Sequence, residues 1–590
     1  MPPRLLVVSL DDTISPADAA LVKLAAFHGL ATEKLVLDPD SRDLVSILSS
    51  GGRAVAMEYS TYRALARREF PFDVLHRFRF ILLYGFGAAA GSPSELGELT
   101  DGAVSSVKSL AAGPRHVEVR GDVKFAAFSV SGRSCCLDMG PTLVFSPSMQ
   151  RGHAEPYITI DGSASLLVLP RGESTLFLLA DSNLIDLDEA LPRGASLRPW
   201  YTQIIAVTIF LRVAFGPWCW TAPLLGATFI IDDPYLKPRY GFLQFESLLA
   251  ELQACGGAVS IAFIPYNYRR TVQRVAAALQ RNSARFSLAI HGCDHTGGEF
   301  ASHDMAWLGH LGHCATQRMI AHERQTELGF DNIMVFPQGR FSTAAARALK
   351  DAGFTAAVNS TPWPEDCDGA SLSVRDVLDV AITRYHSFPI FLRRYPLDVF
   401  DFAFDALFQK PILLVEHHRF FRAGYAPLAD TVRRISTLAT NVSWMPLGHS
   451  LVSSYLLRRD TEHSYVVRHF CPILHLKNPI GAETSLRIEK PEADGVVEAV
   501  LVNGTKAAFQ IESGVLRYVA HLKVGEELDA RVLYRNPSPV RQKVSYKYRC
   551  TTGLRRLACD IRDDYLSRSD FALTFTELLV QRFRKVAASD

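Results

Sequence analysis

The sequence predicts an α/β protein of several domains, in which a (β/α) barrel follows a doubly wound α/β domain and accessory β-sandwich segments accompany both. Strand and helix patterns alternate along residues 5–112 and again along 226–425, as expected for parallel sheets with crossover helices. Short alternating apolar runs separated by Gly, Pro and Ser occupy 116–185 and 465–540, which is typical of antiparallel strands. Polar residues follow the strands of the second α/β segment, so we expect the chemistry there.

Length and composition limit the classes of protein that fit. A chain of 590 residues is too long for one hydrophobic core. It is 48% hydrophobic and 21% charged, with a net charge of +2 and no long basic run, so neither nucleic acid nor an anionic membrane is an expected partner. The ten cysteines lack the spacing of a disulfide framework or of paired CxxC zinc ligands, which favours a reducing compartment.

Two apolar stretches bear on location. The N-terminal segment has no positively charged start, long apolar core or small-residue cleavage site, so it does not read as a secretion signal. Ile204–Ile231 is nearly free of charge, but Pro217, Pro223 and Gly226 divide it into pieces shorter than the ~20 residues of a spanning helix. We expect a cytoplasmic protein without a membrane span, while export by a route not visible in the sequence stays open.

Changes of pattern divide the chain into five segments. We expect a doubly wound α/β domain of the flavodoxin or amidotransferase kind at 1–112, a β-rich domain or extension at 113–200, the barrel with a helical connector at 201–460, an immunoglobulin-like β-sandwich at 465–545, and a strand with an amphipathic helix at 546–590. Asn503-Gly504 predicts a hairpin turn in the fourth segment. The fifth interleaves arginine and leucine, which indicates a packed helix with a solvated face.

The first domain contains an Asp-Asp pair after a strand, Asp11-Asp12, which shows how specific such a pair is by itself. Strands are expected at residues 5–9, 34–37, 54–57 and 80–84, with a helix over Pro16–His28. The first strand ends in Asp11-Asp12, but no histidine pair with metal-ligand spacing follows within this domain. We therefore interpret these acids as a strand-end turn or a helix cap. An Asp-Asp pair after a strand is a weak signal by itself.

Six strands are expected in the barrel, and polar residues follow several of them. The strands are 227–231, 259–264, 286–290, 333–336, 355–358 and 411–415. The polar groups are Asp232 and Asp233, His291 and His295, Pro337-Gln338-Gly339, and His417 with His418. The carboxyl ends of parallel barrel strands meet at one rim, so we expect these side chains to converge. Two histidines and one carboxylate bind a divalent metal with positions left for water and substrate, and the other aspartate is then free to act as a base.

With these residues, segment 226–425 resembles the polysaccharide deacetylase family (NodB-homology, carbohydrate esterase family 4-like), metal-dependent hydrolases of sugar acetyl groups with a distorted α/β barrel. The first family motif, a strand ending in Asp-Asp, is matched by Asp232 and Asp233. The second, His-(Ser/Thr)-x-x-His, is matched by His291 and His295. Gly292 stands at the position of the hydroxyl that steadies the histidine loop in the family. The resemblance covers roughly a third of the chain and suggests a divergent bacterial branch.

The third and fourth motifs are met only in part. Pro337 and Gly339 match Arg-x-Pro-x-Gly, but Val335 stands at the arginine position and Arg340, just beyond, is the expected substitute. The fourth motif, Asp-x-x-Trp, is absent. Trp363 and Asp366 lie in the expected region, but the tryptophan precedes the aspartate.

The fifth motif, a strand ending in Leu-x-His, is approximated by Val415-Glu416-His417, with His418 adjacent. Val415 and His417 share one strand face, so His417 is preferred to His418 as the catalytic acid, and the choice between them stays open.

The resemblance implies a role for each matched residue. Asp233, His291 and His295 would hold a divalent metal, expected to be Zn²⁺ with Co²⁺, Ni²⁺ or Fe²⁺ as alternatives, and Asp232 would be the general base. The residues expected to contact substrate are Pro337, Gly339, Arg340, Trp363 and Tyr235. Tyr266 is a further rim aromatic. Cys293 is expected to point away from the metal, and the four histidines downstream (His303, His310, His313, His322) are expected to be packed or solvated.

Three functions follow. The first is a metal-dependent deacetylase of an N-acetylated sugar or polysaccharide. The second keeps the metal but acts on a non-carbohydrate C–N bond, as the weak third and fourth motifs allow. The third is a catalytically inactive carbohydrate-binding or assembly protein. The expected partner is a carbohydrate or small acetylated molecule, and a homo-oligomer is compatible with the sequence.

Overall fold

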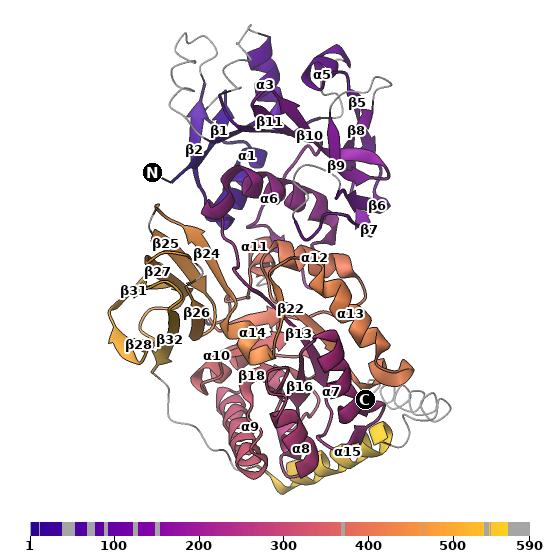
Figure 1. The fold of residues 1–590 in the computed structure, drawn as a ribbon, viewed down its shortest axis with the longest axis vertical. Coiled ribbons are helices and arrows are strands. Elements are labelled where there is room, and N and C mark those ends of the chain that lie inside the picture. The colour runs from indigo at the N-terminus through magenta and orange to yellow at the C-terminus, as the bar shows by residue number, and fades with distance from the viewer. Residues whose placement is uncertain are drawn as a thin grey trace.

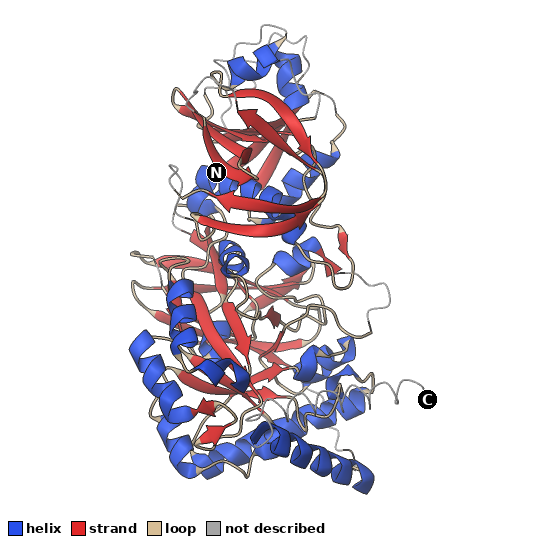
Figure 2. Cartoon of the chain, turned by 90° about the vertical axis from the view of Figure 1, so that its right-hand side faces the viewer, coloured by secondary structure: helices blue, strands red, loops and turns tan. Residues whose placement is uncertain are grey.

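The structure, a computed structural model, describes residues 2–10, 12–37, 53–67, 77–87, 93–121, 128–147, 154–366, 372–462, 464–478, 480–535, 542 and 544–564. An N-terminal α/β domain lies above a barrel, a β-sandwich lies beside the barrel, and a C-terminal helix runs along the lower end of the barrel (Figure 1). The view turned by 90° shows the same stacking of the N-terminal domain on the barrel (Figure 2).

One eleven-stranded sheet runs through the whole N-terminal domain. Its parallel part consists of β2 (Ala31–Val36), β1 (Arg4–Ser9), β3 (Ala54–Glu58), β4 (Phe80–Tyr84) and β11 (Ser174–Leu179), in that order. Its antiparallel part continues through β10 (Ser163–Arg171), β9 (Glu155–Ile160), β6 (Gly113–Val119) and β7 (Arg133–Met139), with β5 (Val104–Leu110) and β8 (Thr142–Pro147) beside it. Because β11 pairs in parallel with β4, the β-rich segment is an extension of the first sheet and not a separate sandwich.

The helices of this domain are α1 (Pro16–Phe27), α3 (Tyr59–Ala66) and α5 (Pro93–Leu99). Ser15 caps α1 by accepting from the Asp18 N–H at 3.0 Å, so the cap that the Asp-Asp pair was expected to supply comes from Ser15. Asp11 lies outside the described residues, and the carbonyl of Asp12 accepts from Lys34. Within the segment 116–185, where short strands are expected, residues 128–130 form a turn.

The helix α6 (Tyr201–Phe215) belongs to the N-terminal domain, so the boundary expected at 201 is corrected. The Nε2 atom of His28 on α1 lies 3.1 Å from the hydroxyl of Thr208, and Phe177 and Phe210 make a T-shaped ring contact at 5.4 Å. An almost wholly apolar helix is buried on all sides, as its composition requires. No described helix combines the length and apolar character needed to cross a membrane.

The barrel is a parallel sheet with strand order β21-β19-β18-β17-β16-β13-β22. Its strands are β13 (Leu225–Asp232), β16 (Val259–Phe263), β17 (Phe286–His291), β18 (Asp331–Val335), β19 (Ala356–Asn359), β21 (Ile390–Leu392) and β22 (Ile412–Glu416), and β23 (Val442–Trp444) also pairs with β13. Beyond the end of β21, a parallel bridge joins Arg394 to Leu414 of β22. This bridge brings the two edges together, so the sheet is nearly closed.

Helices pack around this sheet. They are α7 (Phe245–Cys255), α8 (Gln273–Gln280), α9 (Met305–Thr326), α10 (Thr343–Asp351), α11 (Val374–Leu378), α12 (Val399–Leu407), α13 (Ala426–Ser436) and α14 (Leu447–Val452). Short antiparallel pairs join β12 (Ala190–Leu191) to β20 (Leu372–Ser373) and β14 (Arg239–Tyr240) to β15 (Leu243–Gln244). The residues of β13 are all buried, as parallel strands covered on both faces require.

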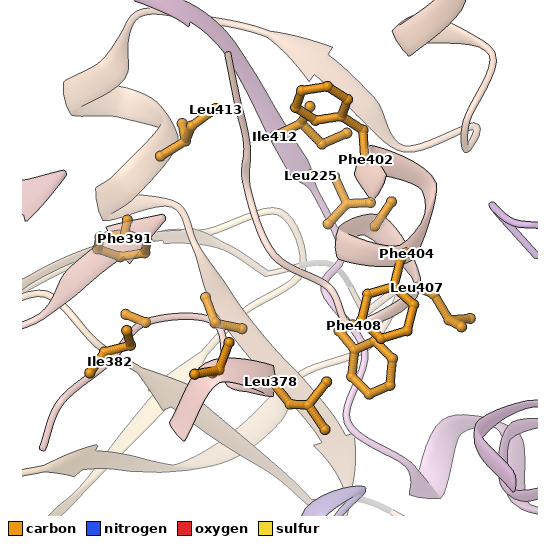
Figure 3. Packing of buried hydrophobic residues seen from close by; sticks show 14 of the residues in the cluster. Leu225, Leu378, Ile382, Phe391, Phe402, Phe404, Leu407, Phe408, Ile412 and Leu413 are labelled. Atoms are coloured by element: carbon orange, nitrogen blue, oxygen red, sulfur yellow. The ribbon is translucent and has the colours of Figure 1, made fainter. Parts of the chain in front are cut away.

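Apolar side chains of α12 connect the barrel to the N-terminal domain. Figure 3 shows Phe404 and Phe408 beside Leu407 at the end of this helix. The Phe404 ring stacks on Tyr201 of α6 at 3.7 Å, and the Phe408 ring lies 6.1 Å from Phe27 of α1. Through α12 and Phe408, the barrel is therefore packed against two helices of the N-terminal domain.

The C-terminal sandwich has sheets of five and four strands. The first contains β24 (Tyr455–Arg459), β25 (Ser464–His469), β27 (Thr484–Pro491), β31 (Val515–Leu522) and β30 (Phe509–Glu512), and the second β26 (Ile473–Lys477), β32 (Glu527–Tyr534), β28 (Val497–Val502) and β29 (Thr505–Ala507). The end of segment 201–460, expected to be a helical connector, also contains two strands. The first, β23, joins the barrel sheet, and the second, β24, joins the sandwich. Asn503 and Gly504 have φ of 49° and 79°, as a type I′ hairpin requires. The described part of the tail is a single helix, α15 (Tyr546–Asp564).

A buried ion cluster fixes the sandwich to the barrel. Glu492 accepts from Lys350 of α10, and its carboxylate lies 2.8 Å from Lys490. Burial opposes ionisation of Glu492, but the two ammonium groups outweigh it and hold its pKa below the ordinary value. Glu492→Gln would leave two buried cations without their anion, and we expect it to destabilise the protein by ~3–5 kcal/mol in urea unfolding.

The pH dependence of this contribution has a definite sign. Because the folded pKa of Glu492 is lowered, the stabilisation is complete above the ordinary value of 4.5 and is lost as the pH falls through the folded value. Glu512→Gln is the matched control, since this carboxylate is 67% exposed in its pair with Arg517 and should change stability by less than ~1 kcal/mol. Equal stability of the two variants would contradict this assignment.

Candidate metal centre

The end of β13 delivers the acid pair to the rim of the barrel. Asp232 is the last residue of the strand and is buried. Asp233 follows with φ of 80°, a backbone conformation that residues other than glycine rarely adopt, while its N–H donates to the carbonyl of Ala262 at 3.2 Å. The strained turn holds Asp233 at the end of the neighbouring strand β16.

Two histidines face Asp233. His291 ends β17, and its Nε2 lies 3.4 Å from Asp233 Oδ1. His295 follows four residues later with φ of 55°, and its Nε2 lies 3.2 Å from the same oxygen. The three ligand atoms all lie within 4.8 Å of one another. Asp233 Oδ1 is buried without a hydrogen-bond partner among the described residues, which is the condition expected of an oxygen that serves a cation.

The three side chains leave one side of the group accessible. His291 is 2% exposed, whereas His295 and Asp233 keep 14% and 22% of their side-chain surface. Two imidazole nitrogens and one carboxylate oxygen form a donor set that suits a divalent transition metal. The residues present therefore fit such an ion, with coordination positions left on the exposed side.

The ring of His291 is oriented for coordination through Nε2. Its Nδ1 lies 2.9 Å from the carbonyl oxygen of Val335, which can only accept, so Nδ1 carries the proton and Nε2 presents its lone pair toward Asp233. Burial lowers the pKa of His291, but the carboxylates of Asp232 and Asp233 outweigh burial and raise it above 6.5. A metal must therefore displace a proton there in weakly acidic solution, and its affinity should fall as the pH is lowered.

His295 has a different neighbour. Its Nδ1 lies 3.4 Å from Nη2 of Arg556 on α15, and a guanidinium can only donate. A neutral ring that coordinates a metal through Nε2 carries its proton on Nδ1, and Nδ1 then cannot accept from Arg556. Metal coordination through Nε2 therefore excludes the hydrogen bond between His295 Nδ1 and Arg556 of α15.

A buried carboxylate supports the histidine loop. Glu299 Oε1 accepts from the N–H groups of Cys293 at 2.7 Å and His295 at 3.1 Å. Glu299 Oε2 accepts from the N–H of Asp294 at 3.1 Å. The loop is thus held through its backbone by Glu299, and no hydroxyl at position 292 is needed. Sequence reasoning missed Glu299, because an acid four residues after His295 has no counterpart in the family motif.

Gly292 is required by the same arrangement. Its φ is +68°, and an added Cβ would lie 2.1 Å from Glu299 Oε1 and 2.5 Å from Pro337 Cγ. Gly292→Ser restores the residue of the family motif, yet we expect it to weaken metal binding by ~10–100-fold, because the loop must shift. Titration with Zn²⁺ measures this affinity. Gly309→Ala, where a Cβ meets nothing within 4 Å, should bind the metal like the wild type, and tight binding by Gly292→Ser would refute the role of Glu299.

Asp232 is paired with an arginine that sequence reasoning did not identify. Arg393 Nη1 and Nη2 donate to the two carboxylate oxygens of Asp232 at 2.6 and 2.7 Å, and both residues are buried. Burial opposes ionisation of Asp232, but Arg393 and then His291 outweigh it and lower its pKa. Arg340, expected to substitute for the arginine of the third motif and to contact substrate, donates to Glu365 at 3.1 Å on the surface. The one sequence feature that could have indicated Arg393 is its position directly after a short apolar run, Ile390–Leu392.

The two candidate acids lie in different surroundings. His417 follows β22 and is near enough to Asp232 to lower its pKa electrostatically. His418 is buried, and its ring packs at 5.3 Å against Tyr240 and at 6.0 Å against Phe242. The choice of His417 over His418 as the catalytic acid stays a prediction.

The remaining predicted residues lie around the rim or in the packing beneath it. Pro337 and Gly339 form a turn after β18, where Pro337 covers Gly292 and the Gly339 carbonyl accepts from Asn359. Trp363 is 9% exposed and belongs to the main core. Tyr235 is buried, with the Arg270 guanidinium 4.4 Å from its ring centroid. Trp363 and Tyr235, which were expected to contact substrate, are therefore packed inside the protein.

Other polar groups near the site face elsewhere. Cys293 Sγ accepts from Arg318 at 3.3 Å, and Asp366 accepts from the N–H of Thr343 at the start of α10. His322 is buried against Phe263 with its Nε2 2.8 Å from Thr271.

No family model matches the sequence, and no curated protein is detectably similar to it. Solved structures are similar to part of the chain. A protein of Mycobacterium smegmatis named provisionally as a polysaccharide deacetylase is 16% identical, with a TM-score of 0.27, over 40% of this chain and 92% of its own. A family 4 carbohydrate esterase from Streptomyces lividans in complex with acetate has 13% identity and a TM-score of 0.23, over 38% and 91%. A mutant of the peptidoglycan deacetylase PdaC from Bacillus subtilis has 9% identity and a TM-score of 0.23, over 39% and 92%. TM-scores this low establish no shared fold, so the function rests on the site itself.

Proposed function

We propose that this chain is a metal-dependent hydrolase that removes the acetyl group from an N-acetylated sugar or polysaccharide. The observation that carries the proposal is the buried Oδ1 atom of Asp233, which has no hydrogen-bond partner among the described residues and faces Nε2 of both His291 and His295. The sequence resemblance of 226–425 to polysaccharide deacetylases supports the substrate class. Zn²⁺ is the metal that we expect from the donor set.

Asp232 is suited to accept a proton from an attacking water. A divalent ion bound by Asp233, His291 and His295 would supply Lewis acidity, acidifying water and polarising a carbonyl oxygen. Arg393 keeps Asp232 ionised through the neutral range and fixes the plane of its carboxylate through two hydrogen bonds. A base whose position is fixed in this way needs no rearrangement when it takes the proton.

His417 is suited to complete the reaction. An amide nitrogen leaves as an amine only if it receives a proton while the C–N bond breaks. His417 follows β22, which pairs with the strand that carries Asp232, so the acid and the base come from adjacent strand ends.

A metal-dependent amidohydrolase acting on a non-carbohydrate C–N bond is the second candidate. Trp363 and Tyr235, the aromatic residues expected to stack on a sugar ring, are both buried, which favours a smaller amide substrate. Acetate release by the full-length protein tests both candidates on N-acetylglucosamine, its oligomers and simple N-alkyl acetamides. We expect turnover of the sugars after metal depletion and reloading with Zn²⁺, and none in the depleted protein. Turnover of the acetamides alone would establish the second candidate, and release independent of metal would contradict both.

A further inference from the structure

A hollow of about 520 Å³ lies at the opposite end of the barrel from the candidate metal centre. Leu225, which starts β13, lines it, whereas Asp232 ends the same strand at the other rim. Three parts of the chain that are distant in sequence form its walls: the turn at 128–133 of the N-terminal domain, helix α6, and the barrel segments 406–409 and 436–441. Pockets of this kind between domains commonly hold small ligands.

Arg212 lines this hollow, and its guanidinium has no partner among the residues that the structure describes. No hydrogen bond or ion pair joins its guanidinium to any residue that the structure describes, and its Nε is fully buried. Burial lowers the pKa of Arg212 to about 10, and no carboxylate opposes that effect. The Nε of Arg212 has no access to water, although the side chain as a whole is only partly buried. A cation in such a place without an anion is costly to the folded protein, and α6 is otherwise mostly apolar. Some compensating negative charge is expected beside it.

Arg133 adds a second cation to the same hollow. Its Nε donates to the carbonyl of Ser129 at 2.8 Å and its Nη2 to the carbonyl of Thr437 at 3.3 Å. These neutral contacts orient the guanidinium but leave its charge uncompensated. Burial, followed by the neighbouring Arg434, lowers the pKa of Arg133. No acidic residue is present among the described residues that line the hollow.

The rest of the lining suits an oxyanion attached to a small organic group. Hydroxyl and amide side chains contribute donors from several directions: Ser131, Thr440, Gln409 and Asn441. Leu225, Leu407 and Leu438 contribute an apolar side. A guanidinium fork matches a tetrahedral phosphate, which accepts several charge-assisted hydrogen bonds at once.

We propose that this hollow, lined by Arg133 and Arg212, binds the phosphate group of a small ligand. The site is separate from the candidate metal centre and does not depend on the hydrolase activity. Occupation would join the N-terminal domain to the barrel, since the phosphate contacts residues of both. Ligand binding should therefore stabilise the folded protein as a whole.

Thermal unfolding of the full-length protein tests this proposal, with inorganic phosphate, glucose 6-phosphate, glucose, and chloride at matched ionic strength as probes. We expect both phosphate compounds, and not chloride or glucose, to raise Tm in a saturable manner. A larger shift with the sugar phosphate would show that the apolar side is used, and an equal shift that the phosphate group alone is bound. A response to phosphate no larger than that to chloride would overturn the proposal.

Variants assign the effect to the two arginines. Arg212→Met and Arg133→Met should each weaken the apparent affinity for phosphate about tenfold or more, while Arg433→Met, an exposed control with 71% of its side-chain surface accessible in its pair with Asp430, should bind like the wild type. Without phosphate, Arg212→Met should have a Tm at least as high as the wild type, because the variant loses no hydrogen bond or ion pair with the described residues and removes a partly buried cation. A lower Tm of Arg212→Met together with unchanged phosphate binding would refute the site.

Discussion

Asp232→Asn is expected to lower acetate release by ~10²–10⁴-fold, the range associated with the loss of a general base, while the protein still binds one metal ion per chain. Asparagine retains the size of the side chain but cannot take a proton from water. It also turns an N–H group toward Arg393, which has only donors. The ligand group of Asp233, His291 and His295 is unchanged. Steady-state rates and metal content of the same preparation measure the two effects.

The chain offers a matched control for this variant. Asp12→Asn alters the other Asp-Asp pair that follows a strand, at an exposed position of the N-terminal domain, and should leave the rate unchanged. If Asp232→Asn kept full activity, Asp232 would not be the base. If it lost the metal together with the activity, Asp232 would instead be part of the metal centre.

Arg393→Met is expected to lower the free energy of unfolding by ~3–5 kcal/mol, the cost of leaving one member of a buried ion pair alone. Both carboxylate oxygens of Asp232 receive their hydrogen bonds from Arg393, and both side chains are almost inaccessible. Without the guanidinium, burial dominates and the pKa of Asp232 rises. Activity should therefore fall near neutral pH and recover in part as the pH is raised and Asp232 ionises.

The pH dependence of stability distinguishes this variant from a general packing defect. In the wild type the folded pKa of Asp232 is lowered, so the stabilisation is present above the ordinary value of 3.8 and lost as the pH falls through the folded value. In Arg393→Met the raised pKa reverses this sign, and the variant should be least destabilised in acid. Arg340→Met, which removes a surface pair with Glu365, is the control and should change stability by less than ~1 kcal/mol. A pH-independent loss in Arg393→Met would contradict the account of the pair.

The barrel strands could be predicted because they are long, apolar and followed by polar residues. The expected strands at 227–231 and 286–290 agree to within two residues at each end with β13 and β17. The strand β21 has three residues, too few to show any periodicity, so the closing edge of the barrel was missed. Arg393, which follows β21 and pairs with Asp232, was missed for the same reason.

The parts of the site that could not be predicted depend on contacts distant in sequence. Glu299 lies in a turn, and only the folded loop shows that its carboxylate accepts from the N–H groups of Cys293 and His295. The contact of Arg556 with His295 joins residues 261 positions apart. Likewise, the pattern of α6 shows a buried helix, but only its contact with α1 at Thr208 shows to which domain it belongs.

The metal content of the purified full-length protein tests the central claim most directly. After metal depletion and dialysis against equimolar Zn²⁺, Co²⁺ and Ni²⁺, elemental analysis of the wild type should give one divalent ion per chain. Asp233→Ala and His291→Ala should each give none, with the fold unchanged by circular dichroism. A wild-type protein that retains no ion, or an Asp233→Ala variant that retains as much as the wild type, would contradict the assignment of Asp233, His291 and His295 as a metal centre.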